Sequence, residues 1–211
     1  MTCRCKSRFN AFFMKNLEWY MKNVYGKYKV ELFNKLGNKV LEIGAGTGIN
    51  LNYYRKETDL TIIEPSSDML EYLKKKVEKS DIKIHITEGF GENLPFEENS
   101  FDSVISTLVL CSVKSQTKVL QEIKRVLKPG GIFIFIEHVI APEGTFTRSV
   151  QNILHPGWKW LFDGCDIKRD TGAVIKRFFP DAEIKNIKFN SPFIPVNYHI
   201  IGHAIKNSYS A

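Results

Sequence analysis

The chain has 211 residues, of which 43% are hydrophobic and 25% charged, and it carries a formal net charge of +7. This composition indicates one globular domain with a full core, and it excludes a disordered tail protein and a small disulfide-bonded scaffold. The surplus charge lies at the N-terminus, because residues 1–39 hold nine basic and two acidic residues whereas the rest of the chain is balanced. A general nucleic-acid-binding surface is therefore not expected.

The first predicted element is a basic amphipathic helical arm over residues 1–36. Its apolar residues recur at steps of three and four, at Phe9, Phe12, Phe13, Leu17, Tyr20 and Val24. This face either packs against the body of the protein or contacts an anionic lipid surface. The chain has no apolar run of the roughly 20 residues needed to cross a bilayer. We expect a cytoplasmic protein, with peripheral membrane contact through the arm as an alternative.

Residues 37–211 are predicted to form a single α/β domain, because strand-like and helix-like segments alternate along them. Strands are expected at 39–45, 60–65, 82–87, 101–107 and 131–138, and helices from about 48 and at 67–79 and 115–127. Residues 183–190 and 198–206 are typical of an antiparallel pair that ends the sheet. The pattern predicts a Rossmann-like, doubly wound, seven-stranded sheet, mostly parallel with an antiparallel last strand.

Residues 141–180 interrupt this alternation and are rich in Gly, Pro, Trp and Phe. The insertion follows the end of a predicted strand, and ligands of such sheets bind at the carboxyl ends of the strands. We therefore expect it to cover the substrate site. Trp158, Trp160 and Phe162 form either the core of this cover or a wall of the substrate site.

A glycine-rich turn stands between the first body strand and the next segment, in the order Val40-Leu41-Glu42-Ile43-Gly44-Ala45-Gly46-Thr47-Gly48. Its G-x-G-x-G spacing differs from the dinucleotide fingerprint, which would need a glycine at Ile49. Such a loop lets the backbone approach a ligand, and Glu42 can accept hydrogen bonds from a cationic amino group. Glu64 ends the second strand, where a carboxylate can accept both hydroxyls of a ribose. The pairing predicts a nucleoside ligand.

Four sequence blocks carry a family resemblance, namely VLEIGAGTG, LTIIEPSSDML, GENLPFEENSFDSVIS and VLQEIKRVLKPGGIFIFIEH. In this order they resemble the class I S-adenosylmethionine-dependent methyltransferases, over about residues 38–138. The resemblance implies S-adenosylmethionine as cofactor, with the loop glycines around its methionine and ribose and Glu64 on the ribose. It also implies contacts to adenine from Met69 and from the backbone near Phe90 and Gly91. Phe90 replaces the Asp of many members, which leaves the adenine amino group to backbone or to Glu92.

The cofactor-binding residues predicted in this way are Glu42, Gly44, Ala45, Gly46, Gly48, Glu64, Pro65, Met69, Gly91, Glu92 and Thr107. Met69 can equally be ordinary core packing. No metal site is predicted, because the cysteines have neither a zinc-knuckle spacing nor that of a disulfide framework.

Further segments resemble the animal methyltransferase-like proteins that act as alkyl thiol S-methyltransferases. They include Thr107-Leu108-Val109-Leu110-Cys111, Glu137-His138-Val139 and Asp163-Gly164-Cys165, and they extend through the insertion and the last strands. The resemblance implies in-line methyl transfer to a small, apolar acceptor, preferably a thiol. A quinone or phospholipid-headgroup methyltransferase, and a non-catalytic S-adenosylmethionine-binding module, remain as alternatives; the oligomeric state stays open.

A thiol acceptor must lose its proton, and three residues of the predicted carboxyl edge and insertion could assist. His138 and Asp163 are the candidate catalytic residues, as base or orienting group, and Arg169 is a structural or anion-binding group. His138 could instead cap its strand, and Asp163 could be a turn residue beside Gly164. Cys111, at the end of the fourth strand, is interpreted as a core filler rather than a covalent catalyst.

Overall fold

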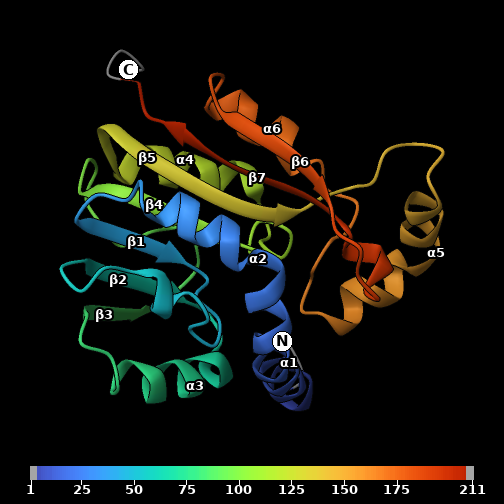
Figure 1. The fold of residues 1–211 in the computed structure, drawn as a ribbon, viewed down its shortest axis with the longest axis horizontal. Coiled ribbons are helices and arrows are strands. Elements are labelled where there is room, and N and C mark those ends of the chain that lie inside the picture. The colour runs from blue at the N-terminus through green and yellow to red at the C-terminus, as the bar shows by residue number, and fades with distance from the viewer. Residues whose placement is uncertain (1–3, 208–211) are drawn as a thin grey trace.

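The computed structural model describes residues 4–207, with side chains from residue 7 onward, and contains one seven-stranded sheet (Figure 1). The spatial order of the strands is β3-β2-β1-β4-β5-β7-β6. Their bounds are β1 (Lys39–Ile43), β2 (Asp59–Glu64), β3 (Lys83–Glu88), β4 (Phe101–Thr107), β5 (Leu127–His138), β6 (Glu183–Lys188) and β7 (Tyr198–Ile205).

Strand directions confirm the predicted fold class. The strands β1 to β5 pair in parallel, and β7 runs antiparallel to both of its neighbours, β5 and β6. Because β1, β4 and β5 are parallel neighbours, their carboxyl ends meet at one edge of the sheet. The candidate active site lies at this edge, which we call the carboxyl edge.

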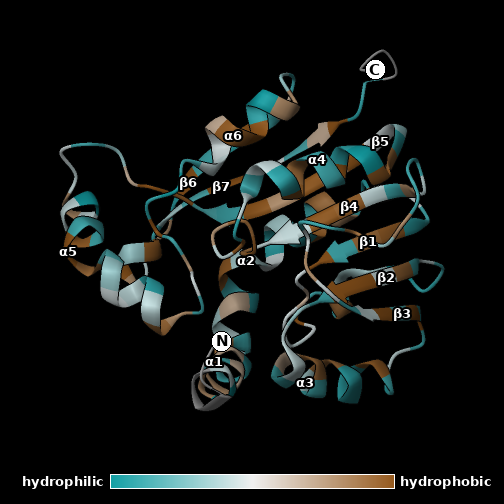
Figure 2. Cartoon of the chain, turned by 180° about the vertical axis from the view of Figure 1, so that it is seen from behind, coloured by the Kyte–Doolittle hydropathy of each residue, from teal (hydrophilic) through white to brown (hydrophobic). Residues whose placement is uncertain are grey.

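Helices cover both faces of the sheet (Figures 1 and 2). Their bounds are α1 (Arg4–Asn16), α2 (Glu18–Phe33), α3 (Ser67–Val77), α4 (Gln116–Val126), α5 (Phe146–Leu161) and α6 (Thr171–Phe178). One core cluster joins α2 and α3 to one face, and a second joins α4 and α6 to the other. The insertion contains α5 and α6, and α5 stands beyond the carboxyl edge rather than on either face (Figure 1).

Local sequence explains these elements. The strands β1, β2 and β4 lie inside the sheet and are mostly buried on both faces, as expected for parallel strands that helices cover on both sides. Capping side chains start α3 and α4, where the hydroxyls of Ser66 and Ser115 accept hydrogen bonds from the backbone of Met69 and Lys118. The buried residues of α4 recur at helical spacing at Val119, Leu120, Ile123 and Val126.

Two local expectations need correction. The N-terminal arm contains two helices rather than one, with a break at Leu17. The helix expected from about residue 48 is wrong, since only one 3-10 turn, η1 (Leu51–Tyr53), is formed there. Asn50 and Asn52 are poor helix formers, and Tyr54 adopts an extended conformation in which its hydroxyl reaches Glu42.

Buried residues of the N-terminal arm belong to the hydrophobic core. On α2, the buried Tyr25, Leu32 and Phe33 belong to the cluster that covers one face of the sheet. Helix α1 packs against α3, and it lies between α3 and α5 (Figure 1). Among the described residues, no helix combines the length and apolarity that crossing a membrane requires.

Candidate active site at the carboxyl edge of the sheet

The glycine loop follows β1 and crosses the carboxyl edge. Gly44, Gly46 and Gly48 all have positive φ angles, at 66°, 56° and 77°, which residues other than glycine rarely adopt. A Cβ on Gly46 would meet nothing within 4 Å, so this stretch of backbone faces open space. The loop therefore offers exposed backbone to a ligand at its centre, while Ala45 is buried below it.

Glu64 ends β2 beside this loop, as predicted. Its carboxylate accepts hydrogen bonds from the backbone N–H of Gly46, at 2.8 Å, and of Ser66, at 2.9 Å. Burial raises the pKa of Glu64 above its ordinary value, against the effect of these two hydrogen bonds. A carboxylate tied to the loop at the end of β2 is suitably placed for ribose hydroxyls. The open backbone at Gly46 together with Glu64 fits the nucleoside part of S-adenosylmethionine.

Glu42 lies beneath the loop and is fully buried. The hydroxyl of Tyr54 and the amide of Asn50 donate hydrogen bonds to its carboxylate at 2.8 and 2.7 Å. Burial raises the pKa of Glu42, although these hydrogen bonds and the charge of Lys29 lower it. The Asn50 amide also donates to the Thr107 hydroxyl at 2.7 Å, so one amide links the ends of β1 and β4.

The candidates for the adenine pocket are dispersed. Met69 is half-buried in the first turn of α3, and Pro65 is exposed just before that helix. Gly91 is buried and lacks room for a side chain, because a Cβ would lie 3.0 Å from Ile43. The Glu92 carboxylate accepts hydrogen bonds from the backbone of Lys114 and Ser115, so in this structure it holds the start of α4. Their roles toward adenine stay predictions.

Next to the glycine loop, the segment after β4 lines the part of the edge where the acceptor is predicted to bind, here called the acceptor side. Leu108 has a positive φ of 58°, which is strained for leucine. The neighbouring Val109 packs so closely on Gly44 that a Cβ there would lie 2.6 Å from it. The buried carboxylate of Glu137 holds the segment by accepting hydrogen bonds from the backbone of Val109 and Leu110, at 3.2 and 3.1 Å. Glu137 was not among the predicted site residues.

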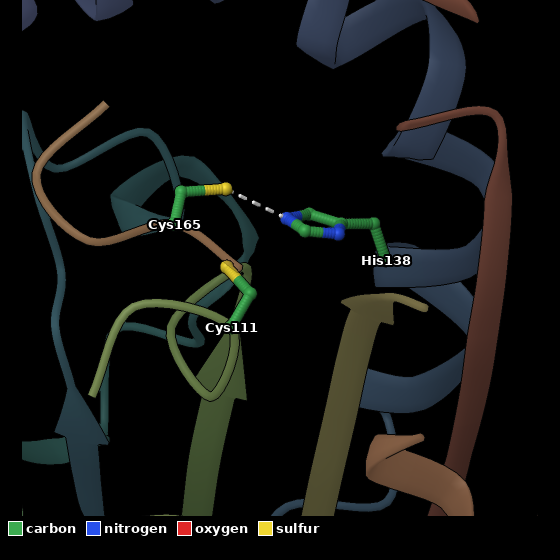
Figure 3. Close-up of side chains that lie close together, drawn as sticks. All are labelled: Cys111, His138 and Cys165. Atoms are coloured by element: carbon green, nitrogen blue, oxygen red, sulfur yellow. Dashed lines mark hydrogen bonds between the residues drawn. The ribbon is translucent and has the colours of Figure 1, made fainter. Parts of the chain in front are cut away.

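A cluster of two cysteines and one histidine lies beside that segment (Figure 3). Cys111 follows β4, His138 ends β5, and Cys165 lies in the loop after α5; all three are buried. Nε2 of His138 is 3.1 Å from Sγ of Cys165, and the sulfur and nitrogen atoms of the three residues lie within 4.8 Å of one another. We call these residues the Cys–His cluster.

Hydrogen bonds divide the charge within the Cys–His cluster. The pKa of the Cys165 thiol is lowered by the neighbouring Cys111 side chain and by the hydrogen bond that the Trp158 indole donates to its sulfur. The pKa of Cys111 is raised by the neighbouring Cys165 side chain and by burial. Burial alone would lower the pKa of His138, but the nearby Cys111 and Glu137 raise it. Cys165 is therefore the sulfur that ionises first.

The other two residues predicted at the acceptor side bind protein groups. The Asp163 carboxylate accepts a hydrogen bond of 2.6 Å from Asn10 of α1, and its φ of 46° marks a tight turn before Gly164. The guanidinium of Arg169 donates hydrogen bonds of 2.6 Å to the carbonyls of Leu110 and Val113. Arg169 thus has the structural role, holding the segment that carries Cys111, and Asp163 ties the insertion to the arm.

The N-terminal arm contributes Tyr25 near His138, and Tyr25 was not among the predicted site residues. The Tyr25 hydroxyl and Nε2 of His199 share a hydrogen bond of 2.6 Å, and the rings of His138 and His199 meet edge to face. Burial and the proximity of His138 lower the pKa of His199 to about 3, so His199 is neutral at physiological pH. One signal was available for the Cys–His cluster, since Cys111 and His138 follow neighbouring parallel strands. Cys165, Tyr25 and His199 had no such signal.

Comparisons with known proteins agree with this geometry. Residues 41–135 match the methyltransferase domain family. The chain is 35% identical to human thiol S-methyltransferase TMT1A over 96% of its own length and 87% of that protein. It is 37% identical to rat thiol S-methyltransferase TMT1B, over 84% of its length and 78% of that protein.

A solved structure shares the fold. Phosphoethanolamine N-methyltransferase 2 of Haemonchus contortus, in complex with S-adenosylhomocysteine, superposes with a TM-score of 0.69 at 20% identity, over 90% of this chain and 56% of that one. The fold, the glycine loop with Glu64 and the extent of the two sequence matches lead to one assignment. The chain belongs to the thiol S-methyltransferase family of S-adenosylmethionine-dependent methyltransferases.

Proposed function

We propose that this methyltransferase acts on small, apolar thiols. The observation that carries the proposal is the position of the Cys–His cluster, beside the segment that packs on Gly44 of the cofactor loop. It presents imidazole and sulfur at a buried place, which suits an uncharged sulfur acceptor. The sequence match to proteins named thiol S-methyltransferases extends across the insertion and the last strands, where acceptor specificity is expected.

The carboxylates of this edge are already engaged by the protein. Glu42 binds Asn50 and Tyr54, Glu137 binds the segment after β4, and Asp163 binds Asn10. A cationic amine acceptor would need such a group for itself, because an unpaired charge is costly to bury. The acceptor side therefore favours a neutral molecule.

S-adenosylmethionine, when bound, supplies an electrophilic methyl group on a sulfonium. The chain has to hold the acceptor sulfur in line with that methyl group, exclude water and stabilise the thiolate, which is the reactive form of a thiol. We propose that the thiolate of the acceptor binds next to His138, whose Nε2 lies 3.1 Å from the sulfur of Cys165. Helix α1 and the insertion exclude water, because the amide of Asn10 joins them through Asp163 and the carbonyl of Leu161.

The test is a panel of acceptors with one carbon skeleton and different reacting groups. Purified protein with methyl-labelled donor is offered an alkyl thiol, the matching amine and alcohol, a phenol and a quinol. We expect label on the thiol alone. Label on the amine or the quinol without the thiol would reject the proposal.

We also propose peripheral contact with a membrane surface through α1 and α5. Phe9 and Phe12 of α1 and Ile153 and Trp160 of α5 are exposed, and the two helices meet where Asn10 binds the Leu161 carbonyl. The same two helices carry basic residues, Arg8 and Lys15 on α1 and Lys159 on α5, of which Lys159 pairs with Asp166. Exposed aromatic residues beside basic ones favour an anionic lipid surface.

Vesicle co-sedimentation tests this contact. Deleting residues 1–30 would remove core residues such as Tyr25, so point substitutions are the sounder variants. We expect Phe9→Ser/Phe12→Ser to reduce binding to anionic vesicles, whereas Ile205→Ser, at an exposed apolar residue of β7, leaves binding unchanged. Equal sedimentation of both variants would remove α1 from the contact.

A further inference from the structure

The Cys–His cluster brings together donors that are remote in the chain. Cys111, His138 and Cys165 come from three separate segments, yet one donor atom of each lies within 4.8 Å of the other two (Figure 3). The side chains converge on a common point between the ends of β4 and β5 and the loop after α5 (Figure 3). All three are nearly inaccessible to solvent.

These donors are the ligand types of zinc. Zinc binds thiolate sulfur and imidazole nitrogen tetrahedrally, and two cysteines with one histidine form a set that leaves a fourth position open. With the usual bond lengths, neighbouring ligand atoms in such a site are about 3.5–3.8 Å apart. The observed convergence is therefore close to a coordination sphere. We propose that Cys111, His138 and Cys165 bind one zinc ion with an open fourth position.

The surroundings hold the donors in place. The indole of Trp158 donates a hydrogen bond to Sγ of Cys165 at 3.3 Å. The backbone N–H of Asp166 donates to the carbonyl of Cys111 at 2.8 Å and so joins the two cysteine segments. Arg169 fixes the residues on both sides of Cys111. Such outer contacts are typical of metal sites, whose ligands have to be oriented before the ion binds.

Core packing alone explains the cluster poorly. Nδ1 of His138 is buried and has no hydrogen-bond partner among the described residues, so sulfur is the only polar neighbour that orients the ring. A single contact from Nε2 to sulfur is a weak anchor for a buried imidazole. A bond from Nε2 to zinc would fix the ring, with the two cysteines as thiolates.

This inference rests on the proposed function for its consequence. The acceptor thiol takes the fourth position and loses its proton to solvent as its sulfur binds zinc, because a coordinated thiol ionises. A lone pair of that sulfur then forms the bond to the methyl carbon, while the carbon–sulfonium bond breaks and its electrons stay on the sulfur of S-adenosylhomocysteine. The product is an uncharged thioether and a weak ligand, so it leaves. His138 is here a zinc ligand rather than the base.

Metal binding can be measured without any activity. The full chain carries Cys3→Ser and Cys5→Ser, so that only the described cysteines remain, and it is kept reduced with a phosphine because dithiols chelate zinc. After loading with zinc and gel filtration, we expect one equivalent of zinc by mass spectrometry. Loading with Co²⁺ should give thiolate-to-cobalt charge-transfer bands and the intense d–d bands of a tetrahedral ion. A protein that retains no metal and shows no cobalt bands overturns the proposal.

Variants locate the ion. His138→Gln and Cys165→Ser should each weaken zinc binding by at least about 100-fold, whereas His85→Gln, at an exposed histidine of β3, should bind as the parent does. Circular dichroism of the metal-free variants checks that they fold. A variant that does not fold is replaced by Trp158→Phe, which keeps the packing, removes the indole hydrogen bond and should weaken binding by about 10-fold. Unchanged zinc binding in the folded variants overturns the assignment.

The two proposals can fail separately. Thiol methylation by protein that binds no zinc would overturn the metal site and leave the function standing. Zinc at the Cys–His cluster with label only on amines would overturn the thiol acceptor and leave the site standing. A change in the cobalt spectrum when an alkyl thiol is added, and none with the matching alcohol, would support the open position.

Discussion

The cofactor side and the acceptor side of the carboxyl edge are built in different ways. The cofactor side consists of the loop from Gly44 to Gly48 and Glu64, which lie within 21 residues of the chain and are joined by one hydrogen bond to Gly46. The acceptor side draws Asn10, Cys111, His138 and Cys165 from most of the chain length. The predicted cofactor site therefore rests on a local motif, whereas the predicted acceptor site depends on tertiary packing.

The largest expected effect is the loss of donor binding when the cofactor side is disrupted. Gly46→Arg places a long side chain in the open space at the loop, on backbone with positive φ. We expect donor affinity, measured by calorimetry, to fall by at least about 100-fold, which is about 2.7 kcal/mol.

Gly130→Arg is the matched control, because Gly130 also has a positive φ and open space but lies at the other end of β5. Both variants place an arginine on backbone with positive φ, so the difference between them reports mainly on the position in the loop. Equal losses of donor affinity in the two variants would remove the loop from the binding site.

The next largest effect is expected when only the acceptor side is disrupted. Glu137→Gln turns an N–H donor toward the backbone N–H groups of Val109 and Leu110, so the segment after β4 loses an acceptor. We expect about 1–3 kcal/mol of lost stability and a kcat/KM for the acceptor that is lower by about 10- to 100-fold.

Thermal unfolding, acceptor kinetics and donor binding measure these effects. Glu122→Gln also removes a carboxylate that accepts from a backbone N–H, that of Leu94, and should lower stability only. If Glu137→Gln weakened donor binding as much as it slowed turnover, the two sides would not be separable.

A smaller effect tests how the arm closes the site. Asn10→Ala removes the hydrogen bonds from α1 to Asp163 and to the Leu161 carbonyl. We expect KM for the acceptor to rise about threefold to tenfold with little change in kcat, because the cover is held less firmly. Asn16→Ala, which removes a hydrogen bond within α1, is the control. Identical kinetics for both variants would argue against a closing role of α1.

A further prediction concerns the pH dependence of stability, at Lys29 between the arm and the cofactor side. Burial lowers the pKa of Lys29 from 10.5 to about 8, although the charge of Glu42 raises it. Between these values the unfolded chain binds a proton that the folded chain releases, so stability rises with pH by up to about 1.4 kcal/mol per unit. The contribution is fully present above pH 10.5 and is lost as the pH falls through 8.

Denaturant unfolding between pH 8 and 10 measures this slope. Lys29→Met keeps the length of the side chain without the titrating group. We expect the free energy of unfolding of the parent to increase with pH relative to that of the variant. Parallel curves would mean that Lys29 is not buried beside Glu42.

The sequence was informative wherever neighbours in the chain are neighbours in space. The alternation of strands and helices predicts the sheet and its antiparallel last strand, and the places of Gly46 and Glu64 follow from strand ends. The turn at 51–53 was missed, because the hydrogen bond from Tyr54 to Glu42 outweighs helical periodicity. The break at Leu17 was missed because the apolar spacing continues through it.

The acceptor side could be predicted only in part. His138 and Cys111 follow neighbouring parallel strands, so their proximity was within reach of the sequence. Cys165 joins them through the hydrogen bond from Asp166 to the Cys111 carbonyl, which no spacing in the sequence indicates. The same holds for Asn10 and Asp163, which are 153 residues apart.

The hydrogen bond between Tyr25 and His199 joins α2 to β7 across 174 residues. Contacts of such long sequence separation have the largest loop-closure entropy to overcome, and they form late when a chain folds. The glycine loop and β2 can assemble from nearby residues, whereas the floor beneath His138 requires both ends of the chain. We therefore expect a nascent chain to complete its cofactor loop before its acceptor side, which needs the last strand in place.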